Sequence, residues 1–162
     1  MTTIPTGVKT GHVLICDFER GFVPPEMVKI RPVVVISKAS VHSRGLCTIV
    51  PLSTTAPSPI EPWHVQLTHS PLPSESQVWA KCDMLYTVSF HRLKWPHRKE
   101  NGKRAYMKAR LGNEDLDAVF AGVRAYLPAP PAVAASAVSV NISAVSVSTT
   151  IIQSEIPPWE DI

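Results

Sequence analysis

The chain has 162 residues with 16 Lys and Arg against 13 Asp and Glu, a length that suits one compact domain and a mildly basic charge. Its three cysteines lie in apolar runs without CxxC spacing, and their odd number argues against a disulfide framework. All the basic residues lie in residues 1–127, which carry a net charge of +6, whereas residues 128–162 carry −3. A basic body favours an anionic partner.

Five short apolar or alternating runs predict β-strands. These runs cover residues 13–18, 32–37, 47–52, 63–68 and 78–84. Clusters of Pro, Gly and Ser separate them, and no crossover helix lies between them. This pattern is typical of a compact β-barrel or sandwich. We expect Cys16, Cys47 and Cys82 to be buried thiols of a reduced, cytoplasmic protein, because residues 1–10 also lack the apolar segment of a signal peptide.

Residues 113–127 change to a helical period and predict one closing helix. Asn113 is the predicted cap, and Glu114 and Asp115 suit the positive end of the helix dipole. The apolar face consists of Leu116, Val119, Phe120, Val123 and Leu127.

The segment 128–162 begins with a Pro-rich turn and continues with Ala, Val and Ser, which predicts a flexible tail. Alternation over residues 138–142 leaves open a strand that adds to a sheet edge or folds over the basic surface. Residues 132–153 carry no charge but include nine polar side chains, so we expect no membrane span.

Three stretches end apolar runs in groups suited to phosphate chemistry. They are Ile30–Ser37, Thr48–Thr55 and Trp79–Asp83, and they supply Arg31, Ser53, Thr54, Lys81 and Asp83. A guanidinium offers phosphate a planar fork and stays charged at any working pH. The sequence shows no cluster of carboxylates, and its six histidines are scattered, so we expect neither a metal nor another cofactor.

A second basic feature is residues 91–110, which hold eight Lys and Arg against one acid, with aromatic residues interleaved. Cations that neutralise phosphates and rings that stack on bases favour single-stranded nucleic acid. Asn101-Gly102 predicts a hairpin tip. A solvated hairpin, or a docking surface for an acidic partner segment, is the alternative. The candidate RNA-binding residues are Arg92, Lys94, Trp95, Arg98, Lys99, Lys103, Arg104 and Tyr106.

The order of these motifs resembles the MazF/PemK/Kid family of endoribonuclease toxins from toxin-antitoxin pairs. The resemblance covers residues 11–127: the opening GHVLICDF, Glu26 five residues before Arg31-Pro32, the turn VPLSTT, the triplet KCD and the closing helix. It implies a mainly β fold, a small Src-homology-3-like barrel of the CcdB/MazF type with a C-terminal helix. It also implies a homodimer whose RNA groove lies at the interface and is blocked by a cognate antitoxin.

The resemblance further implies metal-independent cleavage of single-stranded mRNA at preferred short sequences, leaving a 2′,3′-cyclic phosphate and a 5′-hydroxyl. Arg31 would stabilise the phosphate, with Thr54 and Ser53 beside it. The general base is left open between Asp83 and Glu26.

The two branches of the family differ at two of these positions. The Kid branch has Arg-Cys-Asp where this chain has Lys81 before Asp83, so the helper cation keeps its charge and loses its fork. That branch also has a histidine in the loop where this chain has Pro25, which puts a histidine-assisted step in doubt.

The alternative is a non-enzymatic toxin or binding module of the same fold, such as a DNA gyrase poison. Gyrase poisons of this fold use a tryptophan near the chain end, and this chain has Trp159. That tryptophan follows the long tail, however, and Arg31, Thr54 and Asp83 would have no task in gyrase binding.

Overall fold

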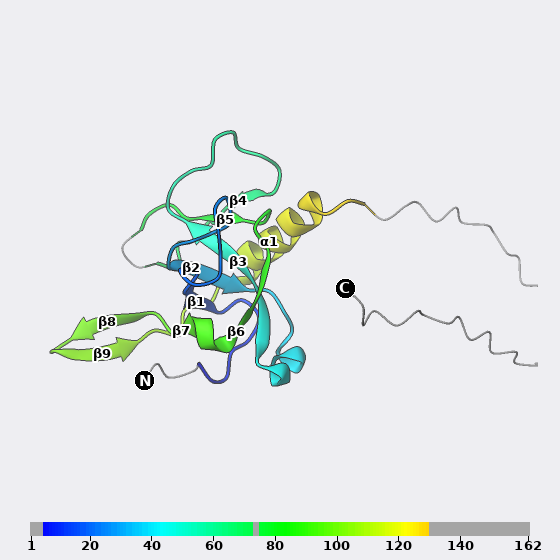
Figure 1. Ribbon diagram of the computed structural model, residues 1–162. Helices are drawn as coiled ribbons and strands as arrows, with labels where there is room; N and C mark the ends of the chain where they lie inside the picture. The colour runs from blue at the N-terminus through cyan, green and yellow to red at the C-terminus, as the bar shows by residue number, and fades with distance from the viewer. Residues whose placement is uncertain (1–4, 73–74, 130–162) are drawn as a thin grey trace, which may run out of the picture. The chain divides into compact units, whose positions relative to one another are not determined.

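The structure is a computed structural model that describes residues 5–72 and 75–129 (Figure 1). Its strands are β1 (Val13–Cys16), β2 (Arg31–Val35), β3 (Leu46–Ser53), β4 (His64–Gln66), β5 (Trp79–Lys81), β6 (Tyr86–Ser89), β7 (Leu93–Lys94), β8 (His97–Glu100) and β9 (Lys103–Tyr106). Two 3-10 helices, η1 (Ala39–Arg44) and η2 (Phe90–Arg92), and one α-helix, α1 (Asn113–Tyr126), complete it. The tail beyond Ala129, with its predicted strand and uncharged segment, lies outside the described residues.

Seven strands form one antiparallel sheet in the order β4-β5-β3-β2-β1-β7, with β6 also paired to β3. The long strand β3 joins two parts of this sheet, because its residues Leu46–Ile49 pair with β6 and Leu52–Ser53 pair with β5. Within the described residues, no pairing closes the sheet into a ring. The predicted class, mainly β with a C-terminal helix, is confirmed.

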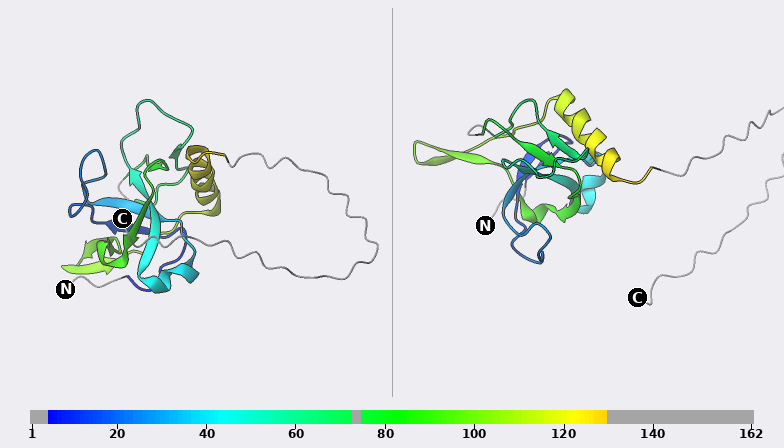
Figure 2. Two further views of the ribbon diagram at one scale, coloured as in Figure 1. Left: turned by 45° about the vertical axis from the view of Figure 1, so that its right-hand side comes forward. Right: turned by 90° about the horizontal axis from the view of Figure 1, so that it is seen from above.

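Both faces of the central strands are buried, which explains the unbroken apolar run of β2. Val33 and Val35 pack into one core cluster, and Val34 between them packs into the other. Such alternation follows from the two-residue period of a strand. The second cluster includes Val119 of α1, which is fully buried. Figure 2 shows α1 beside the sheet.

Helix α1 is tied to the sheet at its first turn and at its middle. The predicted cap is wrong: Gly112 occupies the N-cap and Asn113 is the first helical residue. Asp115 is buried, and its carboxylate accepts the backbone N–H groups of Thr68 at 2.7 Å and His69 at 3.2 Å. It therefore holds the loop after β4 instead of facing solvent. No helix in the described part of the chain has the length and apolarity to cross a membrane.

The hairpin β8–β9 forms a separate two-stranded sheet that projects from the domain (Figures 1 and 2). Its tip is Asn101-Gly102, as predicted, with φ of 49° and 74°. Both angles lie in the left-handed region that a two-residue turn of this kind requires.

Candidate functional site

Arg31 stands where β2 begins and β3 ends. It pairs with Cys16 of β1, and the register of Val33 opposite Pro51 leads on to Ser53, the last residue of β3. Arg31 is half-buried, and none of the ion pairs or side-chain hydrogen bonds among the described residues involves it. Its guanidinium is therefore a cation without a protein counterion in this part of the chain.

Ser53 and Thr54 differ in what their hydroxyls do. The Ser53 hydroxyl donates to the carbonyl of Thr55 and accepts the N–H of Thr55, both at 3.1 Å. This is a local Ser/Thr turn, so Ser53 shapes the end of β3. Thr54 is exposed, and its side chain makes no hydrogen bond within the described residues. Of the two hydroxyls, that of Thr54 is the one open to a ligand.

Glu26 lies exposed in the loop between β1 and β2. Its Oε2 accepts the backbone N–H of Val23 at 2.8 Å, while its own N–H donates to the Val23 carbonyl at 2.9 Å. Met27, the next residue, donates its N–H to the Tyr86 hydroxyl at 3.1 Å. Glu26 is thus engaged in the closure of a loop that β6 anchors.

Asp83 faces a histidine that the sequence did not single out. His64 Nε2 lies 3.7 Å from Asp83 Oδ2, and the His64 side chain is only 10% exposed. His64 Nδ1 accepts the N–H of Glu61 at 3.0 Å, which leaves Nε2 to carry the proton of the neutral ring. Lys81 pairs directly with His64 across β4 and β5. Lys81, Asp83 and His64 therefore form a second polar group of the site.

The second carboxylate oxygen of Asp83 is an exception to the usual hydrogen bonding of buried polar atoms. Asp83 Oδ1 is buried and has no hydrogen-bond partner among the described residues. Buried polar atoms are normally paired, so an orphaned carboxylate oxygen marks a candidate functional group.

The polar group around Arg31 and the polar group around Asp83 lie on opposite sides of β3. Arg31 is on β2 and Lys81 on β5, and both strands flank β3 in the sheet. Neighbouring strands are about 4.8 Å apart, so the two flanking strands are roughly 10 Å apart. Within one chain the structure brings Arg31 to Ser53 and Thr54, and Asp83 to Lys81 and His64. It does not place Arg31 and Asp83 next to each other.

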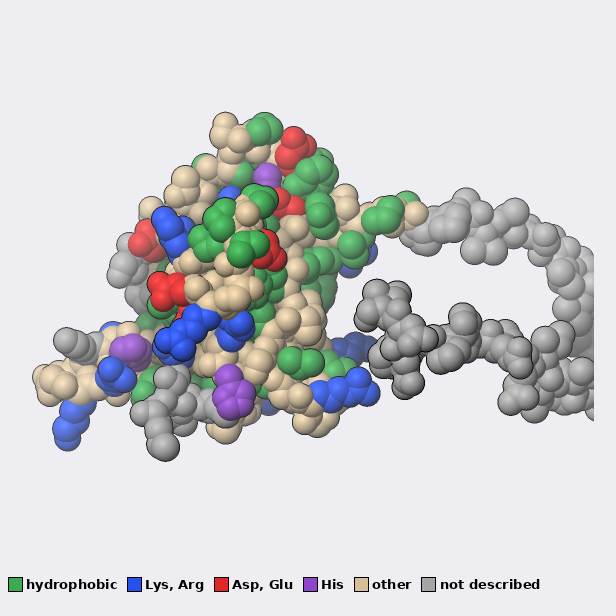
Figure 3. Space-filling view, viewed as in Figure 1, with side chains coloured by type: hydrophobic (Ala, Val, Ile, Leu, Met, Phe, Trp, Pro, Cys, Tyr) green, Lys and Arg blue, Asp and Glu red, His purple; other side chains and the backbone are tan. Residues whose placement is uncertain are grey.

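The predicted RNA-binding residues fall into two sets. Lys94 at the end of β7 and Arg98, Lys103 and Arg104 on the hairpin are exposed. Figure 3 shows Lys and Arg side chains on the projecting hairpin. Arg98 is paired with Glu100, and the exposed ring of Tyr106 lies 5.8 Å from that of His97. Lys99 is part of β8.

The side chains of Arg92 and Trp95 are half-buried and packed against the domain instead. Arg92 Nη1 donates to the carbonyls of Asp17 at 3.2 Å and Arg20 at 2.7 Å. Trp95 is half-buried against the first core cluster, with the His12 ring 5.1 Å away and Lys108 Nζ 5.7 Å from the Trp95 ring centre. Burial and the neighbouring cations Arg110, Lys9 and Lys108 lower the pKa of His12.

A family model of the PemK-like, MazF-like toxin of type II toxin-antitoxin systems matches residues 9–127. The chain belongs to this family. The match includes the whole sheet, the basic hairpin and α1 of this PemK/MazF-like toxin. A search of curated proteins gave no match.

Solved structures share the fold of this toxin at low sequence identity. An endoribonuclease in complex with its cognate antitoxin, from a mycobacterial species, has a TM-score of 0.53 and 18% identity, covering 76% of this chain and 100% of its own. MazF from Deinococcus radiodurans has a TM-score of 0.53 and 20% identity, covering 75% and 94%. A second mycobacterial endoribonuclease has a TM-score of 0.51 and 16% identity, covering 80% and 99%. These similarities support the predicted fold of the MazF type.

The three cysteines of the toxin are free and buried, as predicted. Burial raises the pKa of Cys16 to about 12, that of Cys47 to about 11 and that of Cys82 to about 12. All three therefore stay protonated near neutral pH, and none has the thiolate character of a nucleophile. Within residues 5–72 and 75–129, no three His, Cys, Asp or Glu side chains gather as a metal site would require.

His64 is the site residue of the toxin that sequence reasoning missed. The six histidines lack the spacing of metal ligands, but such spacing does not reveal a single histidine beside a carboxylate. A signal existed, because His64 and Lys81 lie in two consecutive predicted strands. Only the pairing register, which a sequence specifies weakly for short strands, shows that they are opposite each other.

Proposed function

We infer that this toxin is an endoribonuclease that cleaves single-stranded RNA at preferred short sequences. Membership of the toxin family supports the inference, as do two fold-sharing structures described as endoribonucleases. The observation that carries it is the guanidinium of Arg31, half-buried beside the exposed Thr54 and without a counterion among the described residues. Unstacked bases of a single strand are available for reading, which favours this form of RNA.

The proposed reaction needs only side chains. The substrate's 2′-hydroxyl attacks phosphorus and gives its proton to a base, the bond from phosphorus to the 5′ oxygen breaks, and that oxygen takes up a proton. The products are a 2′,3′-cyclic phosphate and a 5′-hydroxyl. Arg31 binds the phosphoryl oxygens and stabilises the charge that develops on them, while the Thr54 hydroxyl orients the same phosphate.

Asp83 is the favoured general base. Its neighbour His64 is fixed by the N–H of Glu61 and faces the carboxylate, whereas one oxygen of Glu26 is already bound to the backbone of Val23. His64 Nε2 carries the ring proton and lies 3.7 Å from Asp83 Oδ2, so His64 orients the carboxylate and does not take its proton. Lys81 adds a positive charge beside them.

A homodimer and an antitoxin complete the proposal. Arg31 and Asp83 flank β3 within one chain, so a groove lined by two copies lets a single RNA strand meet both groups. An antitoxin with an acidic flexible segment would occupy the same basic groove. The mycobacterial structure that contains a cognate antitoxin supports such a partner.

The test is incubation of the purified full chain with a long single-stranded RNA in EDTA. We expect discrete cuts with a cyclic phosphate on the upstream fragment. Arg31→Ala should slow cleavage about 10²–10³-fold, the effect of removing one donor to a developing oxyanion. Arg44→Ala is the matched control, because Arg44 is an exposed cation at the end of η1.

The same assay decides between the two carboxylates. Asp83→Asn should abolish most of the activity, and Glu26→Gln should retain most of it if Glu26 only closes its loop. The reverse order would assign the base to Glu26. If folded wild-type protein, free of antitoxin, leaves the RNA intact, the ribonuclease proposal is rejected and a binding role is favoured.

A further inference from the structure

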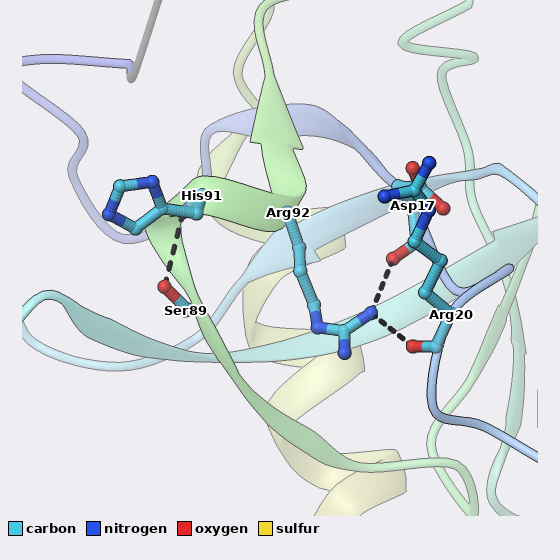
Figure 4. A pocket seen from close by; sticks show the side chains of 5 residues that line it. All are labelled: Asp17, Arg20, Ser89, His91 and Arg92. Atoms are coloured by element: carbon cyan, nitrogen blue, oxygen red, sulfur yellow. Dashed lines mark hydrogen bonds between the residues drawn. The ribbon is translucent and has the colours of Figure 1, made fainter. Parts of the chain in front are cut away.

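A surface pocket lined by charged and polar residues lies beside the end of β1 and is not used by the reaction proposed for Arg31. Its volume is about 340 Å³, within the range of roughly 300–1,000 Å³ found for small-ligand sites. Figure 4 shows it between the start of the β1–β2 loop and the η2 turn. Its lining consists of Asp17, Arg20, Ser89, His91 and Arg92.

The pocket is at the same end of the sheet as Arg31. Arg31 pairs with Cys16, and Cys16 pairs with Leu93 on the next strand. One residue further along, the N–H of Asp17 donates to the carbonyl of Arg92 at 2.9 Å. The pocket is thus two strands from Arg31, which is roughly 10 Å at the usual strand spacing. An RNA strand with one phosphate at Arg31 reaches the pocket with a neighbouring nucleotide.

The guanidinium of Arg92 is held in place before any ligand arrives. Nη1 donates to the carbonyls of Asp17 and Arg20 (Figure 4). The guanidinium carbon lies 4.9 Å from the centre of the Phe22 ring. Its Nε and Nη2 groups make no hydrogen bond within the described residues. Arg20 and His91 are exposed and add a second cation and an imidazole ring. A fixed guanidinium beside a second cation suits a phosphate oxygen.

Asp17 makes the pocket unsuited to phosphate alone. Its Oδ1 accepts the N–H of Glu19 at 2.9 Å, which orients the carboxylate. Among the described residues, Asp17 forms no ion pair with Arg20 or Arg92. A carboxylate repels phosphate but accepts hydrogen bonds from the amino and imino groups of a base, and an imidazole or guanidinium stacks on the base plane. Cations, an acceptor and a ring together match a whole nucleotide.

We propose that this pocket binds one nucleotide of single-stranded RNA next to the cleaved bond, with its phosphate at Arg92 and Arg20 and its base edge at Asp17. The pocket is then a subsite that sets part of the cleavage sequence. This inference rests on the proposed ribonuclease function, because the pocket is assigned as part of the same RNA path.

The experiment measures cleavage kinetics and cut sites on a long single-stranded RNA of mixed sequence. Arg20→Ala and His91→Ala should each raise KM about tenfold with kcat within twofold of wild type, the effect of one charge-assisted contact. Asp17→Asn should change the preferred base at one position beside the cut and leave the other positions unchanged. Arg44→Ala should change neither.

Binding gives a second readout that does not depend on cleavage. A 2′-O-methyl RNA oligonucleotide cannot undergo 2′-hydroxyl attack, and its Kd measured by fluorescence anisotropy should rise about tenfold in Arg20→Gln and His91→Ala. Both residues are exposed, and Asp17→Asn keeps an acceptor for the N–H of Glu19, so the variants should fold.

The outcomes separate the two proposals. Wild-type cleavage together with unchanged KM, Kd and base preference in all the pocket variants would overturn the subsite and leave the ribonuclease standing. Failure of the wild type to cut would overturn the ribonuclease and the subsite together.

Discussion

Arg31 owes its place at the head of β2 to the residue that follows it. A residue before proline is pushed to extended backbone, so Pro32 favours the start of a strand at Arg31. The strand period then puts Arg31 on the face of Val33, at the end of β2 that lies beside the end of β3. A guanidinium in that position presents a planar fork that lysine would not reproduce.

The Cys16 thiol makes the unfolding free energy of the toxin depend on pH in the alkaline range. Burial raises its pKa from 9.0 to about 12, so the unfolded state loses the thiol proton near pH 9 while the folded state keeps it. The stabilisation is therefore complete below pH 9 and is lost as the pH rises toward 12. At pH 10 we expect a loss of about 1.4 kcal/mol from this thiol. In Cys16→Ala the fall in unfolding free energy between pH 8 and pH 10 should be about 1.4 kcal/mol smaller.

Urea unfolding at a series of pH values, in a reductant, measures this effect. Cys16→Ala should be less stable near neutral pH because the smaller side chain leaves a cavity, so the comparison is between slopes and not between absolute values. Parallel pH profiles for the two proteins would contradict the assignment. Cys47→Ala should also flatten the profile, because burial raises the pKa of Cys47 to about 11.

At the scale of elements, α1 is held so closely to the sheet that one position accepts only glycine. A Cβ on Gly122 would lie 2.7 Å from Val65 Cγ2 and 2.9 Å from Cys82 Sγ. Helix propensity alone favours alanine over glycine by about 1 kcal/mol. The close approach to β4 and to the residue after β5 opposes that preference.

Gly122→Ala should therefore destabilise the toxin. Overpacking of a core costs about 1–3 kcal/mol, and the gain in helix propensity offsets about 1 kcal/mol of it, so we expect a net loss of up to about 2 kcal/mol in thermal or urea unfolding. Val65→Ala should cost less in the Gly122→Ala background than in wild type, because it removes the clashing methyl. Additive effects of the two substitutions, or a stabilised Gly122→Ala protein, would show that α1 is not packed this closely.

On the scale of the whole molecule, the positive charge divides between the sheet end at Arg31 and the projecting hairpin. Arg92 Nη1 donates to two carbonyls of the β1–β2 loop, and its side chain is half-buried. The exposed cations of the hairpin lie on β8 and β9. The hairpin makes no strand pairing with the main sheet. Its charges can therefore be removed without disturbing the site.

The salt dependence of RNA binding tests whether the hairpin binds phosphates. Replacing Arg98, Lys103 and Arg104 by Gln should reduce the slope of log K against log salt by about 0.7 for each phosphate that is no longer neutralised. Lys38→Gln, an exposed cation next to η1, should leave the slope unchanged if it lies off the RNA path. An unchanged slope in the triple variant would assign the hairpin to the antitoxin or to solvent.

The sequence by itself determined the element types, because these follow from local periods. Short apolar or alternating runs predicted β1 to β5, the change to a helical period predicted α1, and Asn101-Gly102 predicted the hairpin tip. The sequence also named Arg31 as a strand-entrance cation, because proline acts on its direct neighbour.

Only the tertiary structure decided how these pieces meet. The contact of His64 with Asp83, the separation of Arg31 from Asp83 across β3 and the pocket at Arg92 all depend on the pairing register and strand order. The engagement of Arg92 by two carbonyls depends on how the β1–β2 loop folds back. These features join residues far apart in the chain, and their positions are set by packing of the whole sheet and not by any local pattern.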